Sequence, residues 1–328
     1  MESEGGSGYA GARVIVLGAT GFIGRWVARR LCEAGADVHL FVRSLERAEA
    51  LFAAFGVTGT YVQTDLSEVE TLRRQLRELR PSVTFNLAGY GVDRAERDEA
   101  TAWLLNSRLV GVLCGALRTA RDSAWPGAAI VHAGSALEYG RVGGHLSETG
   151  PARPSSLYGR AKLAGTLRLR RLCRGQRLPG VTARLFSVYG PGEHANRLLP
   201  SLVRLAGTEK SLPLTAGLQR RDFTYVEDVA EGLIRLGLAR AEPGEVVNLA
   251  TGKLTTVRRF CTTACAALSV SVSRLRFGEL PTRPEEMAHD PVSVERLRRL
   301  TNWCPQTPVP EGIARTIEFE SRFGRFPS

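Results

Sequence analysis

The chain has 328 residues, 43% of them hydrophobic and 23% charged, which is enough to bury one large core or two modest ones. No apolar run approaches the roughly 18–20 residues that cross a bilayer, so we expect no membrane-spanning segment. The net charge of +11 comes mostly from arginines spread along the whole chain, which argues against nucleic-acid binding and favours small anionic ligands.

The chain begins with residues 1–11, which are acidic and rich in glycine. They do not form a signal peptide, and we expect a disordered lead-in. The six cysteines are scattered without metal-ligand spacing. We therefore expect reduced thiols, no metal site and a cytoplasmic location.

From residue 12 to residue 190, apolar strands alternate with amphipathic helices. This order predicts an α/β fold with a doubly wound parallel sheet of the Rossmann type. The expected strands cover 13–18, 37–44, 58–68 with its turn, 81–89, 127–135 and 180–190, and the expected helices cover 22–35, 45–56, 68–80, 101–121 and 155–174.

Beyond residue 190 the alternation loosens and proline and glycine become frequent. Residues 221–250 carry a helix and a strand that are expected to return to the sheet. The segments on either side of this return, 191–220 and 251–322, are predicted to form a smaller C-terminal lobe that binds the substrate.

Three glycines stand between the first expected strand and its helix, in the stretch "VLGATGFIGRW". Gly18, Gly21 and Gly24 have the spacing G-x-x-G-x-x-G. A tight turn from a strand into a helix leaves backbone N–H groups and the positive end of the helix dipole facing any anion placed there. Glycine allows the backbone to approach that anion closely. Three glycines in register therefore favour a phosphate-binding loop over a purely structural turn.

Seven motifs follow one another in a fixed order from this loop onward. They are "GATGFIG" (18–24), "TDL" (64–66), "NLAG" (86–89), "SALEYG" (135–140), "YGRAK" (158–162), "RLFSVYGPG" (184–192) and "RDFTYVEDVA" (221–230). In this order the chain resembles the extended short-chain dehydrogenase/reductases, and within them the branch of nucleotide-sugar epimerases, dehydratases and reductases. The resemblance extends from about residue 13 to residue 320 and implies a dinucleotide site at the glycine loop.

The resemblance also implies which residues contact the two ligands. Arg221 and Arg283 are expected against the diphosphate of a nucleotide-diphosphate sugar, and Ser187 stands where the family often has Asn. The implied cofactor contacts are Gly18, Thr20, Gly21, Phe22, Ile23, Gly24, Arg43, Arg47, Asp65, Leu66, Leu87, Ala88, Gly89, Asn106, Tyr158, Lys162, Phe186 and Val188. The implied substrate contacts are Ser135, Ala136, Ser187, Asn196, Arg197, Leu198, Leu214, Arg221 and Arg283.

The residue types of "YGRAK" suggest the chemistry. Tyr158 and Lys162 are four residues apart on an expected helix, so both side chains leave the same face. A cationic lysine one turn away is expected to lower the tyrosine pKa and make proton transfer useful at neutral pH. Ser135, at the end of the fifth strand, is expected to bind the substrate oxygen beside Tyr158. We assign these three residues as catalytic.

The end of the second expected strand bears on the choice of cofactor. Proteins of this fold that prefer NAD place an acidic residue there, whereas this chain has Val42 followed by Arg43 and, one turn later, Arg47. Guanidinium groups suit the 2′-phosphate of NADP. NADP is therefore the expected cofactor and NAD the alternative.

The residues after Ser135 bear on the reaction. The family's 4,6-dehydratases have an Asp-Glu pair there, but this chain has Ala136 and Leu137, and Glu138 on a continuing strand would face the other side. Reduction of a keto group, most commonly at C4, with NADPH and Tyr158 as proton donor, is favoured. A 4-epimerase with tightly bound NAD stays open, and a non-catalytic NADP-binding regulator is remote. The family pairs the helices around residues 95–121 and 155–175 across a dimer interface, so we expect a homodimer.

Overall fold

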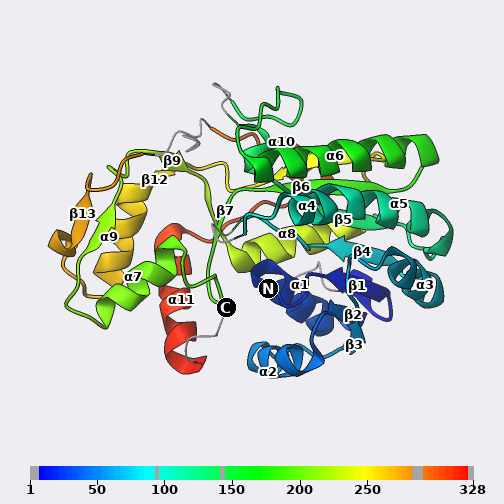
Figure 1. The fold of residues 1–328 in the computed structure, drawn as a ribbon, viewed down its shortest axis with the longest axis horizontal. Helices are drawn as coiled ribbons and strands as arrows, with labels where there is room; N and C mark the ends of the chain where they lie inside the picture. Colours follow the sequence, from blue (N-terminus) through cyan, green and yellow to red (C-terminus); the bar gives the residue numbers. More distant parts are fainter. Residues whose placement is uncertain (1–6, 93–95, 141–144, 283–290, 324–328) are drawn as a thin grey trace.

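The fold is built on seven strands that form one parallel sheet (Figure 1). The computed structural model describes residues 7–92, 96–140, 145–282 and 291–323. The sheet strands are β1 (Arg13–Leu17), β2 (Asp37–Val42), β3 (Thr60–Gln63), β4 (Val83–Asn86), β5 (Ile130–Ser135), β6 (Gly180–Leu185) and β11 (Glu245–Leu249). They lie in the order β11-β6-β5-β4-β1-β2-β3, and each neighbouring pair is parallel. This confirms the predicted α/β class and doubly wound sheet.

Helices cover both faces of the sheet because successive strand residues point to opposite sides. In β1, Val14 and Val16 belong to one apolar cluster, whereas Ile15 and Leu17 belong to the other. The helices of the first cluster are α1 (Phe22–Glu33), α2 (Leu45–Phe55) and α8 (Val226–Leu238), and those of the second are α3 (Val69–Leu79), α5 (Leu109–Ala120) and α6 (Leu157–Gln176).

The helix that enters α5 is interrupted by a π-helical turn. This turn, η2 (Leu104–Arg108), follows α4 (Glu99–Trp103) without a break. It packs against α6 at Gly165, where a Cβ atom would collide with the carbonyl oxygen of Asn106. The π turn and this glycine together bring Asn106 close to the helix that carries Lys162.

The same helical stretch, Glu99–Ala120, is 22 residues long and apolar enough, by length and composition, to cross a membrane. The sequence analysis expected no continuous apolar run of this length, and Asn106 and Arg108 do interrupt this stretch. Half of its most apolar window is buried inside the fold, and Leu109, Leu113 and Leu117 lie in the second apolar cluster. This burial is typical of a core helix.

The remaining elements form a smaller lobe at one end of the sheet, at the left of Figure 1. Its helices are α7 (Leu198–Ala206), α9 (Val257–Ala267) and α11 (Val309–Phe323). Three short strand pairs accompany them: β7 (Ser187–Tyr189) with β10 (Phe223–Tyr225), β9 (Arg220–Arg221) with β12 (Thr255–Thr256), and β8 (Leu212–Leu214) with β13 (Leu275–Phe277). Short 3₁₀ turns also occur at η1 (Ser7–Tyr9), η3 (Ala136–Glu138) and η4 (Val272–Arg274).

Two expected boundaries differ from the structure. The expected strand 180–190 is divided, because the Val188 N–H donates to the Phe186 carbonyl over 3.0 Å and this turn separates β6 from β7. Helix α10 (Glu295–Thr301), expected in the substrate lobe, lies against the edge of the main sheet instead. Arg296 of α10 donates to the Val246 carbonyl over 2.9 Å, which fixes the helix to β11.

The N-terminal lead-in is also shorter than expected. Residues 7–11 are part of the fold, and the ring of Tyr9 is fully buried. Its hydroxyl donates to the Ile234 carbonyl over 2.8 Å, and the ring lies 5.5 Å from that of Trp125. A single aromatic side chain thus orders a segment whose glycine and serine content predicts disorder.

Candidate active site

The glycine loop lies where the carboxyl ends of β1 and β4 meet. Gly18 has φ of +74°, and a Cβ on it would lie 2.7 Å from the Ala88 nitrogen, so only glycine fits this approach. A Cβ on Gly24 would collide with the Gly18 carbonyl oxygen. Gly21 begins α1 without a side-chain cap. The uncapped helix N-terminus, at the switch point of the sheet, fits the diphosphate of a nicotinamide dinucleotide.

The rest of the expected cofactor surface lies along the same sheet edge. Thr20, Phe22 and Ile23 lie in the glycine loop and the first turn of α1, and Leu87 donates its N–H to the Leu17 carbonyl over 3.0 Å. Asp65 follows β3, and its carboxylate accepts from the Ser67 N–H over 2.8 Å, which shapes the turn that carries Leu66. Ala88 and Gly89 follow β4, Phe186 lies between β6 and β7, and Val188 lies in β7.

Two arginines stand at the end of β2. Arg43 and Arg47 are exposed, and within the described part of the chain their guanidinium groups have no hydrogen bond or ion pair. The Ser44 hydroxyl between them accepts from the Arg47 N–H over 3.4 Å and caps α2. Both side chains are therefore available to a ligand at the position where the fold places the adenosine ribose.

The structure brings the three expected catalytic residues together. Ser135 ends β5, Tyr158 lies in the first turn of α6, and Lys162 lies one turn further along. The Ser156 hydroxyl accepts from the Gly159 N–H over 3.1 Å and so fixes the start of the helix. Tyr158 is hydrogen-bonded to Ser135. This is the arrangement that the sequence predicts.

The electrostatics of Tyr158 differ from the prediction. Burial and the negative charge of Glu138 raise the pKa of Tyr158 above its ordinary value, while the hydrogen bond to Ser135 and the charge of Arg197 act in the lowering direction. Lys162 was expected to be the lowering group, but its Nζ lies 5.8 Å from the ring centroid and donates to the Ala133 carbonyl over 2.9 Å. Tyr158 is therefore a neutral phenol that carries a proton.

Lys162 is 3% exposed, and its burial lowers its pKa to about 8, against the opposing charge of Glu138. It faces Gly89, where a Cβ would lie 3.2 Å from both the Lys162 Nζ and the Asn106 Oδ1. The Asn106 side chain makes two hydrogen bonds to the Tyr90 backbone. Its Nδ2 donates to the Tyr90 carbonyl over 2.7 Å, and its Oδ1 accepts from the Tyr90 N–H over 3.3 Å. Asn106 thus holds the chain after β4 against Lys162, and a direct cofactor contact from it stays a prediction.

Apart from Ser135, the expected substrate contacts that the structure describes lie in η3 and in the smaller lobe. Arg197 precedes α7, acts on Tyr158 through its charge, and pairs with Glu193 at 3.3 Å. Ala136 begins η3 and Ser187 begins β7, where the Ser187 N–H donates to the Asp222 carbonyl over 3.0 Å. Asn196 and Leu198 flank Arg197, Leu214 ends β8 and Arg221 ends β9, whereas Arg283 lies outside the described residues.

Sequence reasoning missed the role of Glu138. It is fully buried and lies in the 3₁₀ turn η3, not on a continuing strand as expected. Its carboxylate accepts from the Ser135 N–H over 2.8 Å, while the Ser135 hydroxyl accepts from the Leu137 N–H over 3.2 Å. The pattern Ser135-x-x-Glu138 is the signature of a capping box and could have predicted this turn.

The fold and this site define an enzyme of the extended short-chain dehydrogenase/reductase class that modifies nucleotide sugars. Residues 14–250 match the NAD dependent epimerase/dehydratase family, and the chain belongs to this family. It is 33% identical over 261 residues to the dTDP-6-deoxy-L-talose 4-dehydrogenase (NAD(P)(+)) of Kitasatospora kifunensis, which covers 76% of this chain and 77% of the relative.

Two further relatives differ in what they do. The chain is 30% identical over 318 residues to the UDP-glucose 4-epimerase of Mycolicibacterium smegmatis, covering 94% of this chain and 98% of the relative. Among solved structures, MoeE5 in complex with UDP-glucuronic acid and NAD matches with a TM-score of 0.79 at 25% identity, covering 95% of this chain and 99% of MoeE5. Relatives of this chain thus include dehydrogenases and epimerases, and MoeE5 holds NAD.

The buried carboxyl of Glu193, beside Arg197, generates a prediction about stability. Burial raises the pKa of Glu193 from 4.5 to about 7, although Arg197 acts to lower it. Between these values the folded protein holds a proton that the unfolded chain has lost, so stability falls as pH rises from 4.5 to 7. Glu193→Gln removes this loss, and we expect it to raise the unfolding free energy at pH 8 by about 3 kcal/mol.

Urea unfolding of wild type and Glu193→Gln at pH 5 and pH 8 measures the effect, and the difference should be larger at pH 8. Glu311→Gln serves as the control, because the Glu311 side chain is 47% exposed. A difference between Glu193→Gln and wild type that stays constant with pH contradicts the prediction.

Proposed function

We propose that the protein reduces a keto group, at C4, of a nucleotide-activated deoxysugar with NADPH, in the cytoplasm, where its six free cysteines stay reduced. The observation that carries the proposal is the proton-bearing Tyr158 beside Ser135, at the end of the sheet where the dinucleotide site lies. A neutral phenol is the protonation state that reduction requires, because the carbonyl oxygen must gain a proton.

In the proposed reaction each active-site residue has a distinct role. When bound, the reduced dinucleotide supplies the hydride. Ser135 and Tyr158 bind the keto oxygen, and Tyr158 donates its proton to that oxygen. The Ser135 hydroxyl and the charge of Arg197 stabilise the phenolate that remains. The nicotinamide ribose would be bound by Lys162 and by the residues after β4. Asn106 holds those residues in place.

Dehydration is disfavoured by the residues that follow Ser135. Loss of water from the sugar needs an acid and a base beside the reacting carbons, and these positions hold Ala136 and Leu137. Glu138 cannot replace them, because its carboxylate is fully buried and occupied by backbone and side-chain donors. The site therefore supports hydride and proton transfer without elimination.

The relatives support the general class of reaction, which is chemistry on a nucleotide sugar. The Kitasatospora kifunensis relative is named for dehydrogenation at C4 of a dTDP-6-deoxy sugar with NAD(P)(+), which is the reverse direction of the reaction proposed here. The Mycolicibacterium smegmatis relative favours a second candidate, a nucleotide-sugar 4-epimerase with tightly bound NAD. Both candidates use the same three catalytic residues and differ in the cofactor cycle.

Substitution of the tyrosine tests the mechanism. Tyr158→Phe keeps the ring and removes the proton, so we expect cofactor binding to persist and turnover to fall by roughly two to four orders of magnitude. Tyr61→Phe, on the remote strand β3, is the matched control and should keep full activity. Steady-state rates with 4-keto-6-deoxy sugar nucleotides measure the change, and near-normal turnover of Tyr158→Phe refutes the assigned role.

Charge reversal at the end of β2 tests the cofactor. Wild type should bind NADPH at least about tenfold more tightly than NADH, because Arg43 and Arg47 offer charge-assisted bonds to the 2′-phosphate. Arg43→Asp should reverse this preference by removing one bond and adding repulsion. Arg240→Asp changes the same charge at an exposed position near the end of α8 and should leave the preference unchanged.

Fluorescence titration of both reduced cofactors gives the affinities. The proposed reductase must release its oxidised cofactor in each cycle, so the purified protein should be largely empty. NAD that stays bound through purification, with no preference for the phosphorylated cofactor, contradicts the reductase and supports the 4-epimerase.

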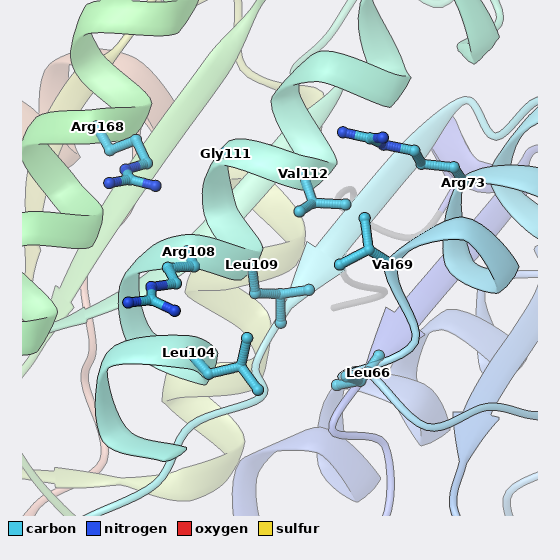
Figure 2. A pocket seen from close by; sticks show the side chains of 9 residues that line it. All are labelled: Leu66, Val69, Arg73, Leu104, Arg108, Leu109, Gly111, Val112 and Arg168. Carbon is cyan, nitrogen blue, oxygen red and sulfur yellow. The ribbon is translucent and has the colours of Figure 1, made fainter. Parts of the chain in front are cut away.

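We also propose that the enzyme is a homodimer that associates through α5 and α6. A groove of about 450 Å³ lies on this face of the molecule, between α3, α5 and α6 (Figure 2). Arg168 crosses α5 at Gly111 there, and Leu167 of α6 is 52% exposed. The groove is lined by Leu66, Val69, Arg73, Leu104, Arg108, Leu109, Gly111, Val112 and Arg168.

Light scattering at micromolar concentration should give twice the mass of one chain. Leu167→Glu places a charge on the proposed interface and should yield monomers, because a buried unpaired carboxylate disfavours association. Leu218→Glu alters a residue that is 70% exposed in the other lobe and should stay dimeric. A monomeric wild type, or a dimer that survives Leu167→Glu, refutes this interface.

A further inference from the structure

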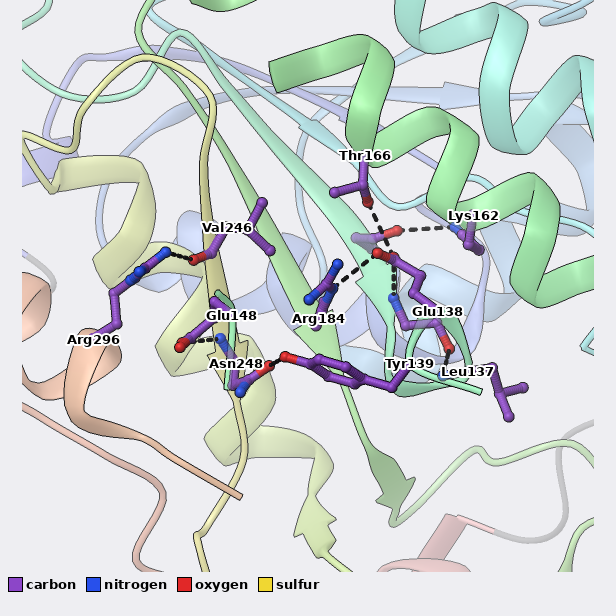
Figure 3. Close-up of polar contacts among 12 residues, drawn as sticks. Leu137, Glu138, Tyr139, Glu148, Lys162, Thr166, Arg184, Val246, Asn248 and Arg296 are labelled. Atoms are coloured by element: carbon purple, nitrogen blue, oxygen red, sulfur yellow. Dashed lines mark hydrogen bonds and ion pairs between the residues drawn. The ribbon is translucent and has the colours of Figure 1, made fainter. Parts of the chain in front are cut away.

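The carboxylate of Glu138 uses both of its oxygens as hydrogen-bond acceptors, with Thr166 and Arg184 among the donors (Figure 3). Oε1 accepts from the Ser135 N–H over 2.8 Å and from the Thr166 hydroxyl over 3.0 Å, and Oε2 accepts from Arg184 Nε over 2.9 Å. Ser135 ends β5, Thr166 lies in α6 one turn beyond Lys162, and Arg184 lies in β6. One side chain therefore joins β5 and α6, which carry the catalytic residues, to the neighbouring strand β6.

The ion pair between Glu138 and Arg184 is buried, with 0% and 5% of the side chains exposed. Arg184 also lies over the Tyr139 ring, 4.4 Å from its centroid. A buried ion pair contributes little net stability, because removing both charges from water costs about as much as their attraction returns. Folding stability alone therefore does not explain this ion pair. Its position beside the catalytic residues points to a role in the active site.

The charges that face Lys162 come from few groups. On β5, burial and the charge of Lys162 hold the pKa of His132 well below its ordinary value, so His132 is neutral. Tyr158, on the same helix, is a neutral phenol. Glu138 is the one carboxylate among the described residues whose charge acts on Lys162. Tyr158 itself is faced by Glu138, Arg197 and Glu96.

We propose that Glu138, paired with Arg184, is a positioning residue of this active site: it fixes Ser135 against α6 and supplies the carboxylate charge that acts on Lys162. The inference rests on the proposed function in one respect, that Lys162 works as a cation in the active site. Burial opposes the charge of Arg184, but the neighbouring Glu138 carboxylate raises the pKa of Arg184.

The composition of the chain makes the charge of Lys162 directly measurable. The sequence contains three lysines, Lys162, Lys210 and Lys253. NMR of protein labelled with ¹³C at lysine Cε therefore yields three titrating signals, without substrate or cofactor. Lys210→Arg and Lys253→Arg assign two of them and leave the third to Lys162. In wild type we expect the Lys162 signal to titrate near pH 8.

Two variants remove the charge of Glu138 and two keep it. Glu138→Gln leaves Arg184 buried without its partner, whereas Glu138→Gln combined with Arg184→Gln replaces the ion pair by two amides that can bond to each other. In both we expect Lys162 to titrate about one pH unit lower, because the opposing charge is gone. Thr166→Val removes a hydrogen bond to the same oxygen but no charge, and Arg184→Lys keeps the cation. In these two variants the midpoint should match wild type.

A Lys162 midpoint that stays at the wild-type pH in the folded charge-free variants overturns the proposal, because Glu138 then has only a structural role. Failure of both charge-free variants to fold also overturns it, since the pair is then a requirement of the fold. A midpoint shift together with no reductase activity in wild type upholds the positioning role and refutes the proposed function alone. The lysine signal thus separates the two conclusions.

Discussion

The parallel direction of all seven strands is the constraint on which the site depends. Their carboxyl ends meet at one edge of the sheet, so residues far apart in the chain, from Gly18 to Ser135, arrive at the same surface. The approach of β1 to β4 is close enough that Gly18 has no room for a side chain. Lengthening or rotating β1 or β4 would displace both the glycine loop and the residues after β4 that face Lys162. The proposed dinucleotide site and the proposed catalytic residues are in this sense one feature of the sheet.

A second layer of constraint comes from helix α6. It brings Tyr158 and Lys162 to the end of β5, and it can do so because Gly165 lets the π turn at Asn106 approach its backbone. The buried carboxylate of Glu138 then joins α6 to the neighbouring strands. Backbone contact places the helix along the sheet, and the polar contact sets how the catalytic side chains face Ser135.

Sequence patterns predicted the features that depend on interactions between residues close together in the chain. Strand and helix alternation gave the sheet, and glycine spacing with the Tyr158–Lys162 interval gave the loop and the catalytic face. The failures concern long-range burial. Tyr9 is ordered by Ile234, which lies 225 residues away in the chain, and no local composition contains that contact. The raised pKa of Tyr158 likewise depends on desolvation by the fold and on the charge of Glu138, which a four-residue spacing does not report.

Burial also explains why the ionisable groups of this site hold protons as they do. Burial raises the pKa of a tyrosine or a glutamate and lowers that of a lysine, which is the direction found for Tyr158, Glu193 and Lys162. Without an opposing charge the same burial would make Lys162 neutral near physiological pH, and an enzyme that uses it as a cation would lose activity there. The Glu138 carboxylate opposes this effect of burial on Lys162, and it lies in the core itself. There it pairs with Arg184 at 2.9 Å, so a buried ion pair lies beside the proposed site of proton transfer.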